Sequence, residues 1–157
     1  MSDAVAITEV GERALIRLSS WEPKSTVPSL VPPGLGGEVR VLSLGPTEWW
    51  VVSDRFDGAK LREHLEPYAG AEGIAAVDLS CAIKVLRVEG SAARELLARG
   101  CGVDFHPSRF PAGRCTRTRL AQLAVVVDCI DPAPRFELYF GRSYLKYLHA
   151  WLVDAVA

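Results

Sequence analysis

The alternation of apolar and polar residues divides most of the chain into short strands. Brief apolar runs bounded by Gly, Pro, Asp or Ser are typical of strands, whereas apolar residues spaced three and four apart indicate helices. These patterns predict strands over residues 13–19, 39–44, 48–53, 74–79, 83–88, 116–120, 123–130 and 135–140.

The strand over residues 48–53 is apolar at four consecutive positions, Trp49-Trp50-Val51-Val52. Since successive strand residues point to opposite faces of a sheet, both faces of this strand are apolar. We therefore expect each face to be covered. The preceding Gly45-Pro46-Thr47 favours a hairpin with residues 39–44.

Two short helices are predicted between these strands. Asp57 is a suitable N-cap for the first, and Pro67, which lacks the N–H for a helical hydrogen bond, predicts its end near Glu66. Ser91 is the expected cap of the second helix, and Gly100 its expected end.

A longer helix is predicted at the end of the chain, over residues 143–156. Its apolar positions recur at helical spacing, and a polar stripe lies on another side. The apolar positions are Tyr144, Leu148, Trp151, Leu152 and Ala155, and the polar ones are Arg142, Lys146 and His149.

The element order from residue 48 to residue 120 is strand, helix, strand, strand, helix, strand. This order is typical of ferredoxin-like split βαβ elements, so we predict an α+β fold with a mainly antiparallel sheet, in one domain spanning residues 1–157. A Pro/Gly-rich loop over residues 20–37 is long for a compact domain, and a partner is one explanation for it.

The charge balance argues against a nucleic-acid partner. Eighteen basic and nineteen acidic side chains give a net charge of -1, without the positive excess that phosphate backbones attract. No leader-like segment and no run of about 20 apolar residues is present, so we expect a cytoplasmic protein without a membrane span. The four cysteines form no C-x-x-C pair and are interpreted as reduced thiols.

Several residue groups carry candidate chemistry, and each has a plainer interpretation. Gly34-Leu35-Gly36-Gly37 lacks the strand and third glycine of a dinucleotide loop. Cys101, Asp104 and His106 are too few for a zinc site, which usually takes four ligands. Asp78-Leu79-Ser80 suits acid–base work or a turn equally well. We therefore predict no catalytic, cofactor-binding or metal-binding residue in this chain.

Histidines, arginines and aromatic residues leave further alternatives open. His64, His106 and His149 are the available bases for a hydrolase, although G-x-S-x-G is absent. A basic stretch suits an anionic ligand, an acidic partner or a solvated strand; it contains Arg109, Arg114, Arg117 and Arg119. Aromatic residues exceed what one small core needs and indicate a partner surface; they are Trp49, Trp50, Tyr144, Tyr147 and Trp151.

Four segments between about residues 40 and 155 resemble the gamma subunit of heterotetrameric sarcosine oxidase. They are Gly45-Pro46-Thr47-Glu48-Trp49, Val77-Asp78-Leu79-Ser80, the stretch over residues 96–113, and Arg142-Ser143-Tyr144 with the Tyr147-Leu148 and Trp151-Leu152 pairs. The resemblance implies a fold related to the folate-binding domain of glycine-cleavage aminomethyltransferases.

The same resemblance implies a structural subunit that docks mainly on an alpha subunit, beside beta and delta subunits. It implies that FAD, FMN, NAD, tetrahydrofolate and zinc belong to those other subunits. The alternative is a free-standing folate-binding protein of the aminomethyltransferase superfamily. The K-G-C-Y-x-G-Q-E signature of single-chain folate-binding relatives is reduced here to Gly100-Cys101.

Overall fold

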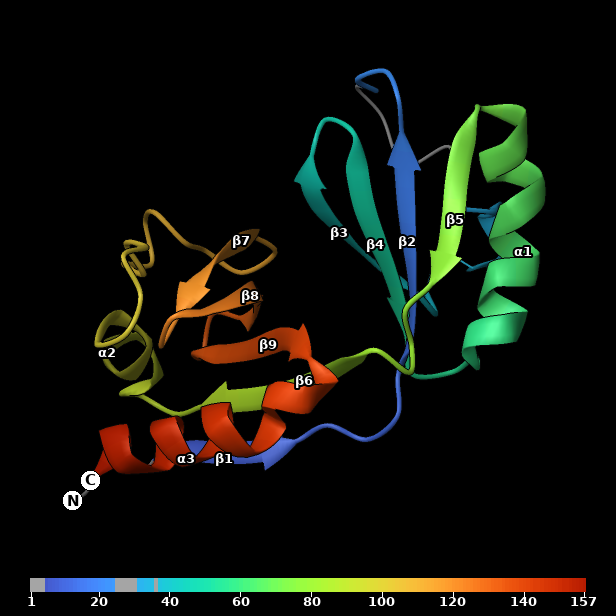
Figure 1. The fold of residues 1–157 in the computed structure, drawn as a ribbon. Helices are drawn as coiled ribbons and strands as arrows, with labels where there is room; N and C mark the ends of the chain where they lie inside the picture. The colour runs from blue at the N-terminus through green and yellow to red at the C-terminus, as the bar shows by residue number, and fades with distance from the viewer. Residues whose placement is uncertain (1–4, 25–30, 36) are drawn as a thin grey trace. The chain divides into compact units, whose positions relative to one another are not determined.

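The computed structural model describes residues 5–24, 31–35 and 37–157 (Figure 1). The chain divides into two compact units, each with its own apolar core. One unit combines residues 1–11 with 83–157, and the other consists of residues 12–82, so the second interrupts the first in sequence. The single domain expected over residues 1–157 stays a prediction.

The unit of residues 12–82 contains a four-stranded antiparallel sheet in the order β3-β4-β2-β5. Its helix α1 connects β4 to β5. Both of these strands pair antiparallel with β2, so they run parallel to each other on either side of it. This is the predicted split βαβ element. The bounds are β2 Ala14–Ser20, β3 Arg40–Gly45, β4 Glu48–Ser53, α1 Gly58–Ala71 and β5 Ile74–Asp78.

The core of this unit lies between the sheet and α1. Ile16 and Leu18 of β2 stand opposite Val51 and Trp49 of β4, and all four side chains belong to one buried cluster with Leu61 of α1. The alternate residues of β4, Trp50 and Val52, are also buried. The prediction that both faces of this strand are covered is confirmed.

Helix α1 begins where the sequence predicts and ends later. The Asp57 carboxylate accepts a hydrogen bond of 2.8 Å from the Lys60 backbone N–H, which confirms the N-cap. The end predicted near Glu66 is wrong, because α1 continues through Pro67 to Ala71. The apolar stripe that begins at Leu61 reaches beyond Pro67 to buried Ala69, and its burial offsets the hydrogen bond that proline cannot make.

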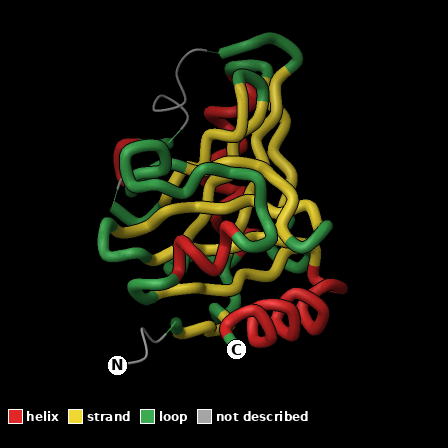
Figure 2. The backbone as a smooth tube through the Cα atoms, turned by 90° about the vertical axis from the view of Figure 1, so that its left-hand side faces the viewer, coloured by secondary structure: helices red, strands yellow, loops and turns green. Residues whose placement is uncertain are grey.

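The other unit contains a five-stranded antiparallel sheet in the order β1-β6-β9-β8-β7. Strand β1 was not predicted, since it is only four residues long. The chain ends on α3, which lies beside β1 (Figures 1 and 2). The bounds are β1 Ala6–Glu9, β6 Ile83–Glu89, α2 Ala93–Ala98, β7 Cys115–Leu120, β8 Leu123–Asp131, β9 Arg135–Gly141 and α3 Leu145–Val156.

Helices α2 and α3 contribute to one core with the five-stranded sheet. Leu96 and Leu97 of α2 and Leu148 and Leu152 of α3 are buried in it. The cap predicted at Ser91 is wrong: Ala92 precedes the first helical residue and makes no side-chain capping bond. Instead, burial of α2 in this core stabilises the short helix.

The predicted α+β class with antiparallel sheets is confirmed, with one difference in arrangement. The strands expected between residues 48 and 120 belong to two sheets, β4 and β5 in one and β6 and β7 in the other. Strands β6 and β7 are separated by β9 and β8, which follow them in sequence. Such non-local pairing is not visible in the order of elements along the chain. Among the described residues, no helix is long and apolar enough to span a bilayer.

Candidate functional site

The histidine nearest to a catalytic arrangement is His106. Its Nδ1 lies 2.7 Å from the Ser108 hydroxyl and also 3.2 Å from the Ser108 backbone N–H. Asp104 accepts from the His106 backbone N–H, at 3.0 Å, and therefore does not orient the ring. A relay needs the carboxylate on the imidazole, so these three residues form a turn.

The other two histidines also lack a catalytic arrangement. The Nδ1 of His64 lies 2.7 Å from the Lys60 carbonyl of its own helix, and the ring contacts Phe56 at a centroid distance of 5.3 Å. His149 is exposed on α3. Neither position provides the oriented base that the hydrolase alternative requires.

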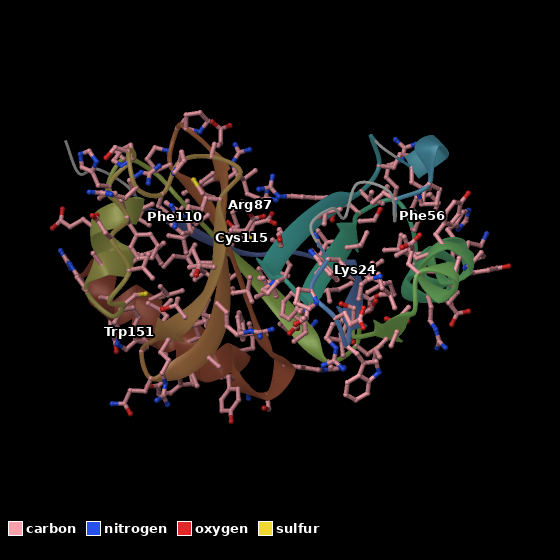
Figure 3. The ribbon with its side chains drawn as sticks, turned by 90° about the horizontal axis from the view of Figure 1, so that it is seen from above. Lys24, Phe56, Arg87, Phe110, Cys115 and Trp151 are labelled. Carbon is pink, nitrogen blue, oxygen red and sulfur yellow. The ribbon has the colours of Figure 1, made fainter. Side chains whose placement is uncertain are left out.

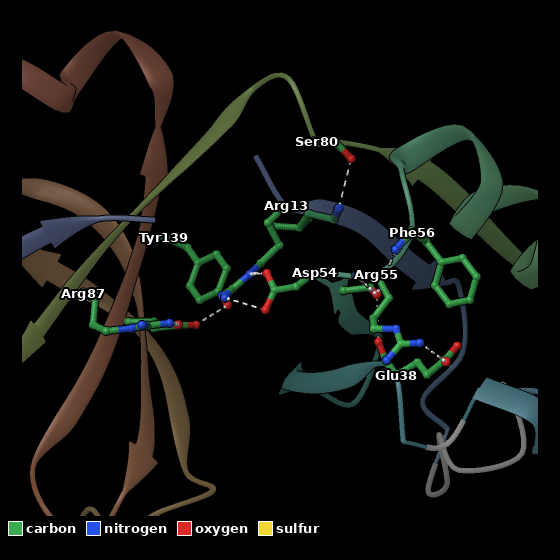
Figure 4. Close-up of polar contacts among 11 residues, drawn as sticks. Arg13, Glu38, Asp54, Arg55, Phe56, Ser80, Arg87 and Tyr139 are labelled. Atoms are coloured by element: carbon green, nitrogen blue, oxygen red, sulfur yellow. Dashed lines mark hydrogen bonds and ion pairs between the residues drawn. The ribbon is translucent and has the colours of Figure 1, made fainter. Parts of the chain in front are cut away.

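Asp78 and Ser80 fasten the end of β5 to its neighbours. The backbone N–H and the hydroxyl of Ser80 both donate to Asp78 Oδ1, at 2.9 and 2.6 Å, and the hydroxyl accepts from the Leu15 N–H at 3.0 Å (Figure 4). A Cβ on Gly58, the first residue of α1, would lie 2.5 Å from that hydroxyl. The turn interpretation therefore accounts for both polar side chains.

The proposed metal ligands are placed in different roles. The Cys101 thiol lies 3.4 Å from the Thr118 hydroxyl, while Asp104 and His106 belong to the turn described above. Within the described ranges, no group of three or more His, Cys, Asp or Glu side chains is arranged to hold a metal. The absence of a metal site in the whole chain stays a prediction.

The glycine-rich segment is only partly described, since Gly36 and residues 25–30 lie outside the described residues. Pro33–Leu35 form a 3₁₀ turn, and Leu35 is buried. The Glu38 N–H donates to the Leu35 carbonyl at 2.9 Å. The buried Leu35 side chain therefore anchors this part of the 20–37 loop.

Arg94 of α2 organises the loop before β7, a role that no sequence pattern indicated. Its guanidinium donates to the carbonyls of Phe105 and Phe110, at 2.6 and 2.9 Å, and lies 5.1 Å from the Phe136 ring centroid. Both loop phenylalanines are buried, and Phe110 is labelled in Figure 3. The loop is thus held by one cation and two aromatic anchors.

A charged network crosses β6 and β9 on the face opposite the helices. Arg87 donates to the buried Glu137 carboxylate at 2.8 Å, and the Tyr139 hydroxyl donates to its other oxygen at 3.0 Å (Figure 4). Glu89 and Arg135, the next pair in register on this face, form a second ion pair at 2.8 Å. Glu137 is thus compensated as a structural carboxylate.

Cys129 is the most enclosed of the four free thiols. Burial raises the pKa of the Cys129 thiol above its ordinary value, and the neighbouring Arg94 guanidinium offsets this only in part. The thiol therefore stays protonated at neutral pH, which makes it a poor nucleophile.

The aromatic residues separate into buried and exposed groups. Trp49 and Trp50 are 2% and 6% exposed, so the interpretation of this pair as a partner surface is wrong. Tyr144 and Tyr147 of the last helical region are 51% and 50% exposed. Trp151 is partly buried against Gly100. Asp78, Cys101 and His106 have structural roles, so the exposed tyrosines are the stronger functional candidates.

Comparison with known proteins identifies the family. The model of the sarcosine oxidase, gamma subunit family matches residues 27–157. The chain belongs to the sarcosine oxidase gamma subunit family. The resemblance seen in the four sequence segments is thereby confirmed.

Individual members of this family are distant but extensive matches. The gamma subunit of sarcosine oxidase from Corynebacterium sp. (strain U-96) is 27% identical over 157 residues, which covers 96% of this chain and 75% of the relative. That from Corynebacterium sp. (strain P-1) is 31% identical over 117 residues, covering 74% and 56%. The chain thus spans between about half and three quarters of these relatives.

Two solved structures share the fold. A chain of the heterotetrameric sarcosine oxidase from Corynebacterium sp. U-96, in complex with pyrrole 2-carboxylate, matches with a TM-score of 0.83 and 24% identity, covering 99% of this chain and 85% of that one. Aminomethyltransferase T of the glycine cleavage system from Bartonella henselae matches with a TM-score of 0.67 and 14% identity, covering 95% and 45%. The predicted relation to the aminomethyltransferase fold is confirmed.

Proposed function

We propose that this chain is the non-catalytic gamma subunit of a heterotetrameric sarcosine oxidase-type flavoenzyme complex. The complex oxidatively demethylates sarcosine or a related N-methyl amino acid. The observation that carries this proposal is the family match over residues 27–157. The fold shared with a chain of a heterotetrameric sarcosine oxidase supports it.

The roles of the polar side chains agree with a subunit that acts through its surface. His106 and Asp78 are engaged in turns, and Glu137 is compensated by Arg87 and Tyr139. Flavin and amine chemistry would then belong to the other subunits. In this proposal the alpha subunit is the main contact, with beta and delta subunits in the same assembly and a cytoplasmic location. FAD, FMN, NAD, tetrahydrofolate and zinc are held by those partners.

Co-expression with the alpha, beta and delta subunits of the same organism tests the proposal. We expect one assembly that contains all four chains and consumes oxygen when sarcosine or another N-methyl amino acid is supplied. Omitting this chain should lower the yield of assembled enzyme, while the chain alone should show no activity. Recovery of a complete active enzyme that excludes this chain would contradict the proposal.

The alternative, a free-standing folate-binding protein, is favoured by one observation, the likeness to aminomethyltransferase T over 95% of this chain. The remnant of the folate signature has a packing role here. A Cβ on Gly100 would lie 2.5 Å from the Trp151 ring, and the Cys101 thiol contacts Thr118. Titration calorimetry of the isolated chain with tetrahydrofolate separates the two functions, because micromolar binding would favour the alternative.

A further inference from the structure

The last helix presents aromatic side chains on the side that it does not bury. Leu148 and Leu152 of α3 are fully enclosed in the core. Tyr144, immediately before α3, and Tyr147, within its first turn, are each about half exposed. Tyrosine is enriched in protein interfaces because it offers a large rigid contact area and a hydroxyl that can hydrogen-bond.

This aromatic side is fixed to the hairpin that joins β7 to β8. The Tyr147 hydroxyl donates to the Ala121 carbonyl at 2.9 Å, and the Ala121 N–H donates to the Gly100 carbonyl at 3.0 Å. Trp151 packs where Gly100 has no side chain. The surface is therefore preorganised, which lowers the entropic cost of binding a partner.

The tip of this hairpin carries backbone strain. Leu120 pairs with Leu123, and the two residues between them, Ala121 and Gln122, have φ angles of 50° and 70°. Two consecutive non-glycine residues in the left-handed region are costly, since each Cβ approaches a carbonyl oxygen. Strain of this kind that persists in a protein is a reason to look for function nearby.

The hairpin and the segment around Tyr144 carry basic residues and no acidic ones. No Asp or Glu occurs in residues 105–127 or in residues 138–153. Arg119, Arg142 and Lys146 are exposed, and the described residues provide no carboxylate partner for any of them. Arginine and lysine elsewhere in the described chain commonly have such partners, as in the Arg62–Glu66 pair.

We propose that this surface, called the Tyr144 patch, is the docking site for a partner subunit. The matching surface of that subunit would be apolar where it contacts the tyrosines and would carry carboxylates around that area. A second copy of this chain is a poor occupant, because a two-fold contact would place like charges together. The inference rests on the proposed function and specifies where the subunit binds. The patch consists of Arg119, Gln122, Arg142, Tyr144, Lys146 and Tyr147.

A pair of nearly isosteric substitutions at the tip tests the charge of the partner. Gln122→Asp and Gln122→Asn differ in charge only, and both residues tolerate the left-handed conformation. Each variant is co-expressed with the alpha, beta and delta subunits and with a wild-type chain that carries a distinguishing tag. The fraction of purified complexes that contain the variant instead of the wild-type chain is then measured. We expect Asn to enter like wild type and Asp to be depleted about threefold or more.

A double substitution tests the whole patch. Arg142→Glu with Tyr144→Ser should reduce entry into the complex at least about tenfold, because it reverses a charge and removes an exposed aromatic contact. The matched control is Arg62→Glu with Tyr68→Ser on α1, where the tyrosine is 42% exposed. Melting temperatures of the isolated chains check that both double variants fold.

The outcomes separate the inference from the function on which it rests. If wild type enters the complex and the Gln122→Asp and double variants enter equally well, the Tyr144 patch is not the docking site, although the proposed function stands. If the isolated chain forms a dimer that the double variant abolishes, the occupant is a second copy and the inference is wrong. Exclusion of wild type from the complex contradicts the proposed function itself.

Discussion

Strand β4 and helix α3 both carry aromatic residues that the sequence marks as a possible partner surface, yet the structure uses them differently. In β4, Trp49 and Trp50 point to opposite faces of a sheet and both are buried. Helix α3 supplies Leu148 and Leu152 to the core, while Tyr147 of α3 and Tyr144 immediately before it remain half exposed. An aromatic surplus therefore predicts a partner surface only where the element has a side that its own core does not use.

The largest expected effect comes from the buried side of this comparison. Trp49→Ala should destabilise the protein by about 3–5 kcal/mol, because it removes a large side chain from the core beside α1. Tyr144→Ala should cost less than about 0.5 kcal/mol, since its ring is half exposed. Urea unfolding followed by circular dichroism measures both. Similar losses for the two variants would remove the distinction between β4 and α3.

The next effect concerns Arg94, a partly buried polar side chain whose role is structural. Arg94→Met should cost about 2–4 kcal/mol, because the Phe105 and Phe110 carbonyls lose a charged donor. Arg62→Met removes only an exposed ion pair with Glu66 and should cost less than about 0.5 kcal/mol. Urea unfolding measures both changes. If Arg94→Met lowered the free energy of unfolding by less than about 1 kcal/mol, Arg94 would not be what holds the loop before β7.

A smaller effect of opposite sign is expected at the strained tip. Gln122→Gly should stabilise the protein by up to about 1 kcal/mol, because glycine adopts a φ of 70° without a Cβ clash. Ala124→Gly, two residues along in β8, should instead destabilise by about 0.5–1 kcal/mol. Thermal unfolding of the two variants gives the comparison. Destabilisation by both would show that the tip is not strained.

The thiols give the smallest effect on stability and a clear difference in reactivity. Cys81 is exposed and should react with a thiol reagent in the folded protein, whereas Cys129 should react only after unfolding. Because burial raises the Cys129 pKa in the folded state, its neutral form contributes stability below the unfolded pKa of about 8.5, and that contribution is lost as pH rises through the folded pKa. Cys129→Ala should therefore lessen the fall in stability at alkaline pH, measured by urea unfolding. Rapid labelling of folded Cys129 would contradict this burial.

Local patterns were sufficient to predict most elements of this fold. Short apolar runs predicted β2, β4 and β9 nearly residue by residue, and the Asp57 cap placed the start of α1. The end of α1 was missed because burial of Ala69 outweighs the preference of Pro67. Local sequence signals therefore predict the start of a helix well where a side chain makes a capping hydrogen bond. They predict its end poorly where burial in the core determines the last residue.

The candidate site depended on information that is not local. Arg94 and Phe110 are sixteen residues apart, and Tyr147 meets Ala121 across twenty-six. The cross-strand pair of Arg87 and Glu137 depends on the register of β6 with β9. None of these contacts can be predicted from a single sequence. The resemblance of residues 96–113 to the family could be recognised without knowing how those residues pack.

If this chain is one subunit of a four-chain flavoenzyme, the mass of the purified assembly must include it. Native mass spectrometry of the complex purified after co-expression should show one copy of this chain with one alpha, one beta and one delta subunit and their bound flavins. An alpha, beta and delta assembly that retains its full activity and flavin content, with this chain recovered separately as a monomer, would contradict the account.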